Sequence, residues 1–215
     1  ERGELDQAQS ALEASLEDDP ESKQGLAALA ELHLQRGAYH DAAESWVKLC
    51  SVLQERAERA PLGQVYLRLG ELYSQQLPDP ERAEIALSRA VELLPDDLRA
   101  LGLLAELYAQ EGRQRAQQAA LEALLEGLPP SPARERVLIQ QALLRDQLGD
   151  HAQAAATLTE ALRLAPASLP LLRAHSTLLE RRGAAQELAA HLAQGCQTLR
   201  AAIELNPADL ESWRY

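Results

Sequence analysis

The sequence predicts an all-α solenoid, in which helical hairpins stack one after another along the chain. The tetrapeptide Leu-Ala-Glu-Leu at residues 29–32 recurs at 104–107, and a near copy, Leu-Gly-Glu-Leu, stands at 69–72, so the copies begin 40 and 35 residues apart. A glutamine follows six residues after the first leucine of each copy. Ala, Leu, Glu, Gln and Arg dominate the composition, and all of them are good helix formers.

The repeats divide the 215-residue chain into seven consecutive segments. Residues 1–22 predict the second helix of a truncated repeat, and residues 210–215 predict the start of a further first helix. Five hairpins are expected between these ends, at 23–62, 63–97, 98–131, 132–168 and 169–209. Because the pattern is incomplete at both ends and Met is absent, the sequence predicts a segment of a longer protein.

Helix start and stop signals justify each hairpin in turn. In the first, Gly37 ends the first helix, and the second helix is expected to run on to about Arg59. The second has an extra residue in the turn Leu-Pro-Asp-Pro at 77–80, and the third closes at Pro129. The fourth has a weak first helix and a clear second one, and the fifth is expected to have a long second helix at 184–205. Apolar residues at i, i+3, i+4 and i+7 give the first helices one buried face.

The pattern resembles the tetratricopeptide repeat, a helix–turn–helix unit of about 34 residues. In the third hairpin, Leu101, Leu104, Ala105 and Tyr108 stand where the family places large and small residues of these kinds, whereas Gln117 replaces a usual alanine. The resemblance covers nearly the whole chain and is stronger up to residue 131 than after it. It implies an all-α, right-handed α–α superhelix of about five hairpins, with incomplete repeats at both ends and the first helices along the concave side.

Two rows of polar residues are expected on that concave side. The resemblance implies that positions 9 and 13 of each first helix face the groove, and these positions carry Glu and Gln in the first three hairpins. They are Glu31, Gln35, Glu71, Gln75, Glu106 and Gln110. Residues four apart share a helix face, so the rows predict an acidic groove for a basic or amide-rich peptide, or for a partner helix. The alternative is that Glu and Gln are simply good helix formers on a solvated face.

The charge distribution narrows the class of partner. The net charge is −12, and residues 1–97 hold 20 acidic and 9 basic residues, against 13 acidic and 12 basic residues in 98–215. Binding to phosphates needs clustered positive charge, so nucleic acid is not expected as a partner. A membrane span is not expected either, because no run approaches the roughly 18 apolar residues that it requires.

The sequence contains no recognisable catalytic, cofactor-binding or metal-binding pattern. Its five histidines share no motif, and none stands four residues from another His or Cys, as ligands on one helix face would. We therefore expect a protein that is not an enzyme and uses neither cofactor nor metal. Cys50 and Cys196 are expected to be free thiols in a reducing, cytoplasmic compartment. The 19 Arg against 2 Lys indicate a bacterial source.

The expected function is a non-catalytic scaffold or adaptor for protein–protein interaction, with a peptide or partner helix in the acidic groove. Two alternatives remain open. In the first, the incomplete ends expose apolar faces, including Trp213, and copies of the chain stack end to end as a self-associating structural segment. In the second, the chain is the regulatory or targeting arm of a larger enzyme.

Overall fold

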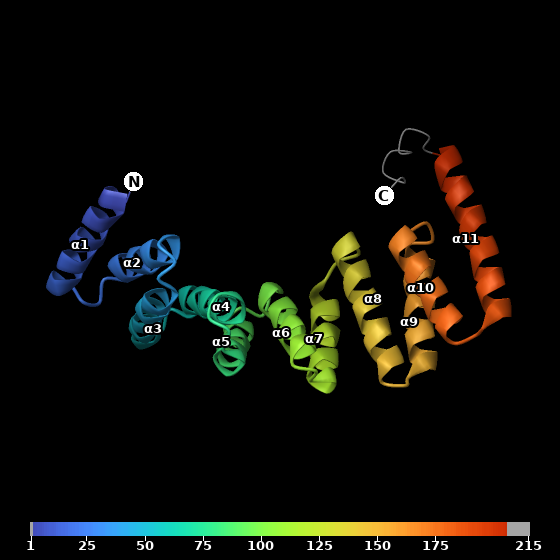
Figure 1. Ribbon diagram of the computed structural model, residues 1–215, viewed down its shortest axis with the longest axis horizontal. Coiled ribbons are helices and arrows are strands. Elements are labelled where there is room, and N and C mark those ends of the chain that lie inside the picture. The colour runs from blue at the N-terminus through green and yellow to red at the C-terminus, as the bar shows by residue number, and fades with distance from the viewer. Residues whose placement is uncertain (1, 206–215) are drawn as a thin grey trace. The chain divides into compact units, whose positions relative to one another are not determined.

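Residues 2–205 are described by the computed structural model, with side chains from Leu5 onward (Figure 1). Within this range the chain forms eleven α-helices and no β-strand, in agreement with the predicted all-α class. The helices are α1 (Arg2–Asp18), α2 (Lys23–Gln35), α3 (Tyr39–Glu55), α4 (Arg59–Gln75), α5 (Pro80–Leu93), α6 (Arg99–Gln110), α7 (Gln114–Gly127), α8 (Pro132–Gln147), α9 (His151–Leu164), α10 (Leu169–Arg181) and α11 (Ala185–Leu205). The expected helix start at 210–215, with Trp213, lies outside the described residues.

The helices gather into two compact units. Unit 1 is Glu1–Ala120 and unit 2 is Leu121–Tyr215, so the boundary falls inside α7 and inside the third expected hairpin. Consecutive helices pair within each unit: α2 with α3 and α4 with α5 in unit 1, and α8 with α9 and α10 with α11 in unit 2. These pairs are the antiparallel hairpins on which the prediction of a solenoid depends.

Close approach of α4 and α5 holds the centre of unit 1. Gly70 of α4 faces Leu87 of α5, and a Cβ built on Gly70 would stand 2.4 Å from Leu87 Cδ2. Leu87 is fully buried, and the core of the unit also includes Trp46 and Tyr73. Because an isolated helix of about 14 residues is marginal in water, this packing between helices is what stabilises each hairpin.

The two cysteines are free thiols in different environments. Cys50 of α3 belongs to the core of unit 1, and burial raises the pKa of its thiol to about 12. Cys196 of α11 is exposed. The prediction that both thiols are free is confirmed.

Five helices end in the same type of turn. The second residue after the helix has a positive φ, and the amide of the residue that follows donates a hydrogen bond to the carbonyl five positions earlier. This is the Schellman motif, which favours glycine because glycine has no Cβ to clash in the left-handed region. Four of the five turns have glycine there, at Gly37, Gly112, Gly149 and Gly183.

The remaining turn, at Ala57, makes α3 shorter than expected. The sequence predicted a second helix that continues to about Arg59, but α3 ends at Glu55 and α4 begins at Arg59. Ala57, with φ 55°, takes the left-handed position, and the Glu58 amide donates to the Leu53 carbonyl at 3.0 Å. The extra residues therefore extend the first helix of the next hairpin. In contrast, α11 spans Ala185–Leu205 and agrees with the long helix expected at 184–205.

Candidate partner-binding surface

Three first helices carry the predicted polar rows, and all three lie in unit 1. Glu31 lies on α2, Glu71 on α4 and Glu106 on α6, and each is followed four residues later by the glutamine that ends its helix. Glu31, Glu106 and the three glutamines are exposed, whereas Glu71 is half-buried. Each Glu–Gln pair therefore shares a helix face and stands at the same place in its helix.

The spacing between these first helices is unequal. The helix α4 packs directly against α6, whereas α2 reaches α4 through α3. The N-terminal ends of α2 and α4 are joined by an ion pair in which Lys23 Nζ lies 2.6 Å from Glu58 Oε1. Glu71 and Glu106 thus stand on directly packed helices, and Glu31 stands on a helix that is one packing contact further away.

Two arginines interrupt the acidic row at Glu71. Arg68 lies one turn earlier on α4, with its Nη1 atom 3.8 Å from Glu71 Oε2. Arg99, at the start of α6, pairs with Asp97 at 2.6 Å and donates to Gln64 Oε1 of α4 at 3.2 Å. Its hydrogen bond to Asp97 chiefly, and the charge of Glu71 to a smaller extent, raise the pKa of Arg99.

The surface is therefore mixed in charge at its centre, a feature that the prediction of an acidic groove did not include. Glu31 and Glu106 make no ion pair with the side chains of residues 5–205. The negative charge that remains open to a partner is thus concentrated on α2 and α6.

A cluster on the α5–α6 contact fixes the position of α6. Both oxygens of Glu84 are bound by the Arg113 guanidinium, at 2.6 and 3.0 Å, and Glu84 Oε1 also accepts from the Tyr108 hydroxyl at 2.9 Å. The Arg113 guanidinium stacks over the Tyr108 ring, 4.6 Å from its centroid. The hydrogen bond from Arg113 is the main reason that the pKa of Glu84 is lowered. The cluster orients α6 and therefore the side chain of Glu106.

Gln35 borders a second feature of the surface, a hollow of about 490 Å³ that it shares with Leu5, Asp6 and Arg36. The Arg36 guanidinium lies 2.6 Å from Asp6 Oδ1 and donates to Gln9 Oε1 at 2.6 Å. The polar row on α2 therefore continues onto α1, for which the sequence predicted only the second helix of a truncated repeat.

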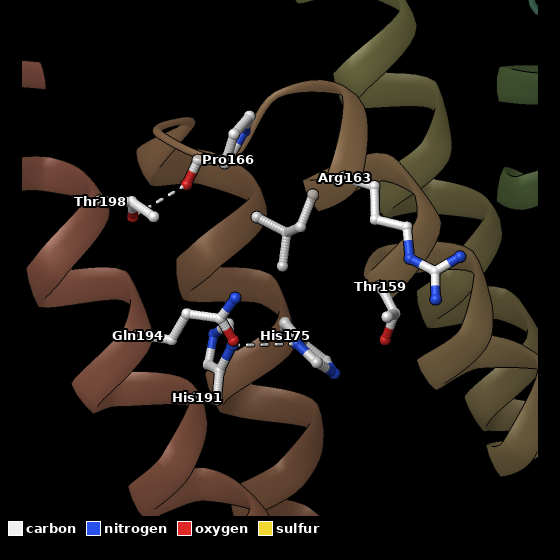
Figure 2. Close-up of a pocket in the computed structure, with 8 residues that line it drawn as sticks. Thr159, Arg163, Pro166, His175, His191, Gln194 and Thr198 are labelled. Atoms are coloured by element: carbon white, nitrogen blue, oxygen red, sulfur yellow. Dashed lines mark hydrogen bonds between the residues drawn. The ribbon is translucent and has the colours of Figure 1, made fainter.

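Sequence reasoning missed a pair of histidines in unit 2. His175 of α10 and His191 of α11 have their Nδ1 atoms 3.3 Å apart and their ring centroids 4.4 Å apart (Figure 2). The two residues are 16 positions apart, so no local spacing indicates their contact. Only the pairing of α10 with α11 brings them together.

Within residues 2–205 no group of three or more His, Cys, Asp and Glu side chains is arranged to hold a metal ion. Among the same residues, no helix combines the length and apolar character needed to cross a bilayer.

Comparisons with known proteins agree with the architecture. Residues 135–168 match the family model of the tetratricopeptide repeat, whereas the search of curated proteins gives no match. The crystal structure of MamA protein is similar with a TM-score of 0.61 and 16% identity, over 87% of this chain and 97% of that one. The crystal structure of BtubC from P. vanneervenii has a TM-score of 0.59 and 16% identity, over 94% and 90% of the two chains. YrrB, described as a TPR protein with an unusual peptide-binding site, has a TM-score of 0.57 and 20% identity, over 80% and 84%.

Proposed function

We propose that this chain, in which residues 135–168 match the tetratricopeptide-repeat model, is a protein–protein interaction scaffold that binds an extended peptide or a partner helix along the first helices of unit 1. The observation that carries the proposal is the repetition of one Glu–Gln pair at one register on α2, α4 and α6. A single Glu–Gln pair would be common on the exposed face of a helix. Three pairs at the same register give carboxylates and amides on successive first helices, which suits a partner that is itself extended or helical.

The charges of this surface describe the partner. Glu31 and Glu106 favour Lys or Arg side chains at the two outer contacts. Near Glu71, the guanidinium groups of Arg68 and Arg99 favour an amide or a carboxylate instead. The partner is therefore basic at its outer contacts and polar at its centre. Since the charged groups are near the surface, binding weakens as salt concentration rises.

Peptide selection tests the proposal and requires no candidate partner. A library of random peptides displayed on phage is selected against the whole chain, and the selected peptides are expected to be rich in Lys, Arg, Asn and Gln. Binding of synthetic copies is then compared between the wild type and two triple variants. The test variant carries Glu31→Lys, Glu71→Lys and Glu106→Lys. The matched control has the same change in net charge on the exposed second-helix residues, as Glu44→Lys, Glu55→Lys and Glu81→Lys.

We expect the test variant to lose about tenfold or more in affinity, which is about 1.4 kcal/mol, while the control variant stays close to wild type. Equal losses in both variants would mean that the peptides respond only to net charge. Unchanged binding in the test variant would remove the first helices of unit 1 from recognition. Light scattering over a dilution series addresses the alternative, because end-to-end self-association would raise the mass with concentration.

A further inference from the structure

A small polar pocket lies in unit 2 between α9, α10 and α11 (Figure 2). Its volume is about 270 Å³, slightly below the range of about 300–1,000 Å³ that is typical for drug-sized ligands. Six polar residues line it, together with Leu162 and Pro166: Thr159, Arg163, His175, His191, Gln194 and Thr198. Among these described lining residues none is acidic.

Hydrogen bonds fix where the protons of the two imidazoles lie. His191 Nε2 is 3.2 Å from the Leu172 carbonyl oxygen, which can only accept, so Nε2 carries a hydrogen. In the neutral ring, His191 Nδ1 is then an acceptor. His175 Nδ1, at 3.3 Å, must donate to it, and this leaves His175 Nε2 as the nitrogen with a free lone pair.

In this arrangement the histidine pair accepts one proton easily, whereas a second proton on the pair is costly. A proton added to His175 Nε2 gives a cation and leaves the His175–His191 hydrogen bond intact. A further proton on His191 would set two N–H groups against each other across 3.3 Å. Burial, and then the proximity of His191, lower the pKa of His175 and so favour its neutral form in the absence of an anion.

The other charged groups around the pair nearly cancel. On α9, Arg163 is paired with the exposed Glu160 at 3.0 Å. Arg182, just after α10, disfavours the charged form of His175, whereas Glu187 of α11 favours it. Protonation of His175 therefore adds a positive charge to a pocket that Arg163 and Gln194 also line.

We propose that the pocket binds a small carboxylate, held by Arg163, Gln194 and the protonated His175, and that binding takes up one proton. A carboxylate fits these donors because it is planar and accepts paired hydrogen bonds from a guanidinium. The lining offers no backbone amides from a helix N-terminus, which phosphate sites commonly use. Because the anion favours the charged imidazole, affinity falls as the pH rises.

The test is a titration of the full 215-residue chain with sodium acetate, a monocarboxylate that is ionised at both test pH values, followed by NMR of the histidine ring resonances. Sodium phosphate and sodium chloride at equal ionic strength serve as comparison ligands. We expect a saturable shift of the His175 and His191 signals at about pH 5.5, and binding about tenfold weaker at about pH 7.5. Isothermal titration in two buffers of different ionisation enthalpy then reports the proton that is taken up.

Three variants decide the assignment. His175→Gln is expected to abolish the pH dependence, and Arg163→Gln, which changes an exposed residue, to weaken binding at both pH values. His151→Gln is the matched control, because His151 is an exposed histidine of the same unit that contacts Asp146 instead. No saturable shift, an affinity independent of pH, or equal binding by His175→Gln overturns the proposal. Phosphate binding as tight as acetate binding overturns the preference for carboxylate.

Discussion

Replacement of Gly70 by alanine tests whether the close approach of α4 and α5 stabilises unit 1. The new Cβ would stand 2.4 Å from Leu87 Cδ2 and 2.5 Å from Leu87 Cγ, whereas carbon atoms in contact are about 3.5–4.0 Å apart. Leu87 is fully buried among close-packed neighbours, so it has no free space to enter. To restore contact distance, the Leu87 side chain or the two helices must therefore shift by about 1 Å.

The size of the effect follows from two opposing terms. Overpacking of a core costs about 1–3 kcal/mol, and alanine in place of a helical glycine recovers about 1 kcal/mol. Since the overlap at Gly70 is large, we expect a net loss of about 1–2 kcal/mol. Gly102→Ala in α6 is the matched control: its built Cβ meets no atom within 4 Å, so only helix propensity acts and the variant gains about 1 kcal/mol.

Urea unfolding followed by far-UV circular dichroism measures both variants. The same substitution is then made in a Leu87→Ala background, where the space against Gly70 is open and the destabilisation should disappear. A Gly70→Ala protein as stable as the wild type would refute the reasoning. So would an equal loss of stability in the Leu87→Ala background.

Three further predictions concern single contacts and use the same unfolding assay. Ala57→Gly removes the cost of about 1–2 kcal/mol that an L-residue has in the left-handed region, so it should raise the stability of unit 1, and a loss would contradict the turn geometry. The pKa of Asp97 is lowered to about 2, mainly by its hydrogen bond from Arg99, so its stabilising effect is full above about pH 4 and is lost as the pH falls towards about 2. Asp97→Asn should therefore be less stable than wild type by up to about 1 kcal/mol at neutral pH, with the difference closing in acid. A double-mutant cycle of Glu84→Gln and Arg113→Gln should show that the two losses of stability are not additive, because each change removes the same ion pair, and additivity would show that the pair is fully screened.

Helix ends show how far the sequence determines this fold. Gly37 predicted the end of its helix because glycine readily adopts the left-handed conformation of the turn, and the structure confirms it. Ala57 forms the same turn, but alanine is among the best helix formers, so local sequence favours continuation of α3. The end of α3 depends on packing in unit 1, which the spacing of the repeats does not report.

The candidate surface was predictable in part for a similar reason. The register of Glu31, Glu71 and Glu106 follows from the repeat itself, and their place at the surface agrees with it. The ion pair of Glu71 with Arg68 is local, since the two residues are three apart on α4, whereas the charge of Arg99 belongs to the next hairpin and comes near Glu71 only through the packing of α4 against α6. The histidine pair of unit 2 is likewise a tertiary contact between two helices, and residues 16 apart carry no periodic signal of it.

Because the two thiols differ in exposure, their rates of alkylation can report how often unit 1 unfolds locally. Alkylating agents react with thiolates, and Cys50 is both enclosed by its neighbours and held in its protonated form. Cys196 is open to reagent in the folded chain. Labelling with iodoacetamide should therefore modify Cys196 first. The rate of alkylation at Cys50 depends on how often unit 1 exposes its interior. Mass spectrometry of the two cysteine peptides would measure that rate without any added probe.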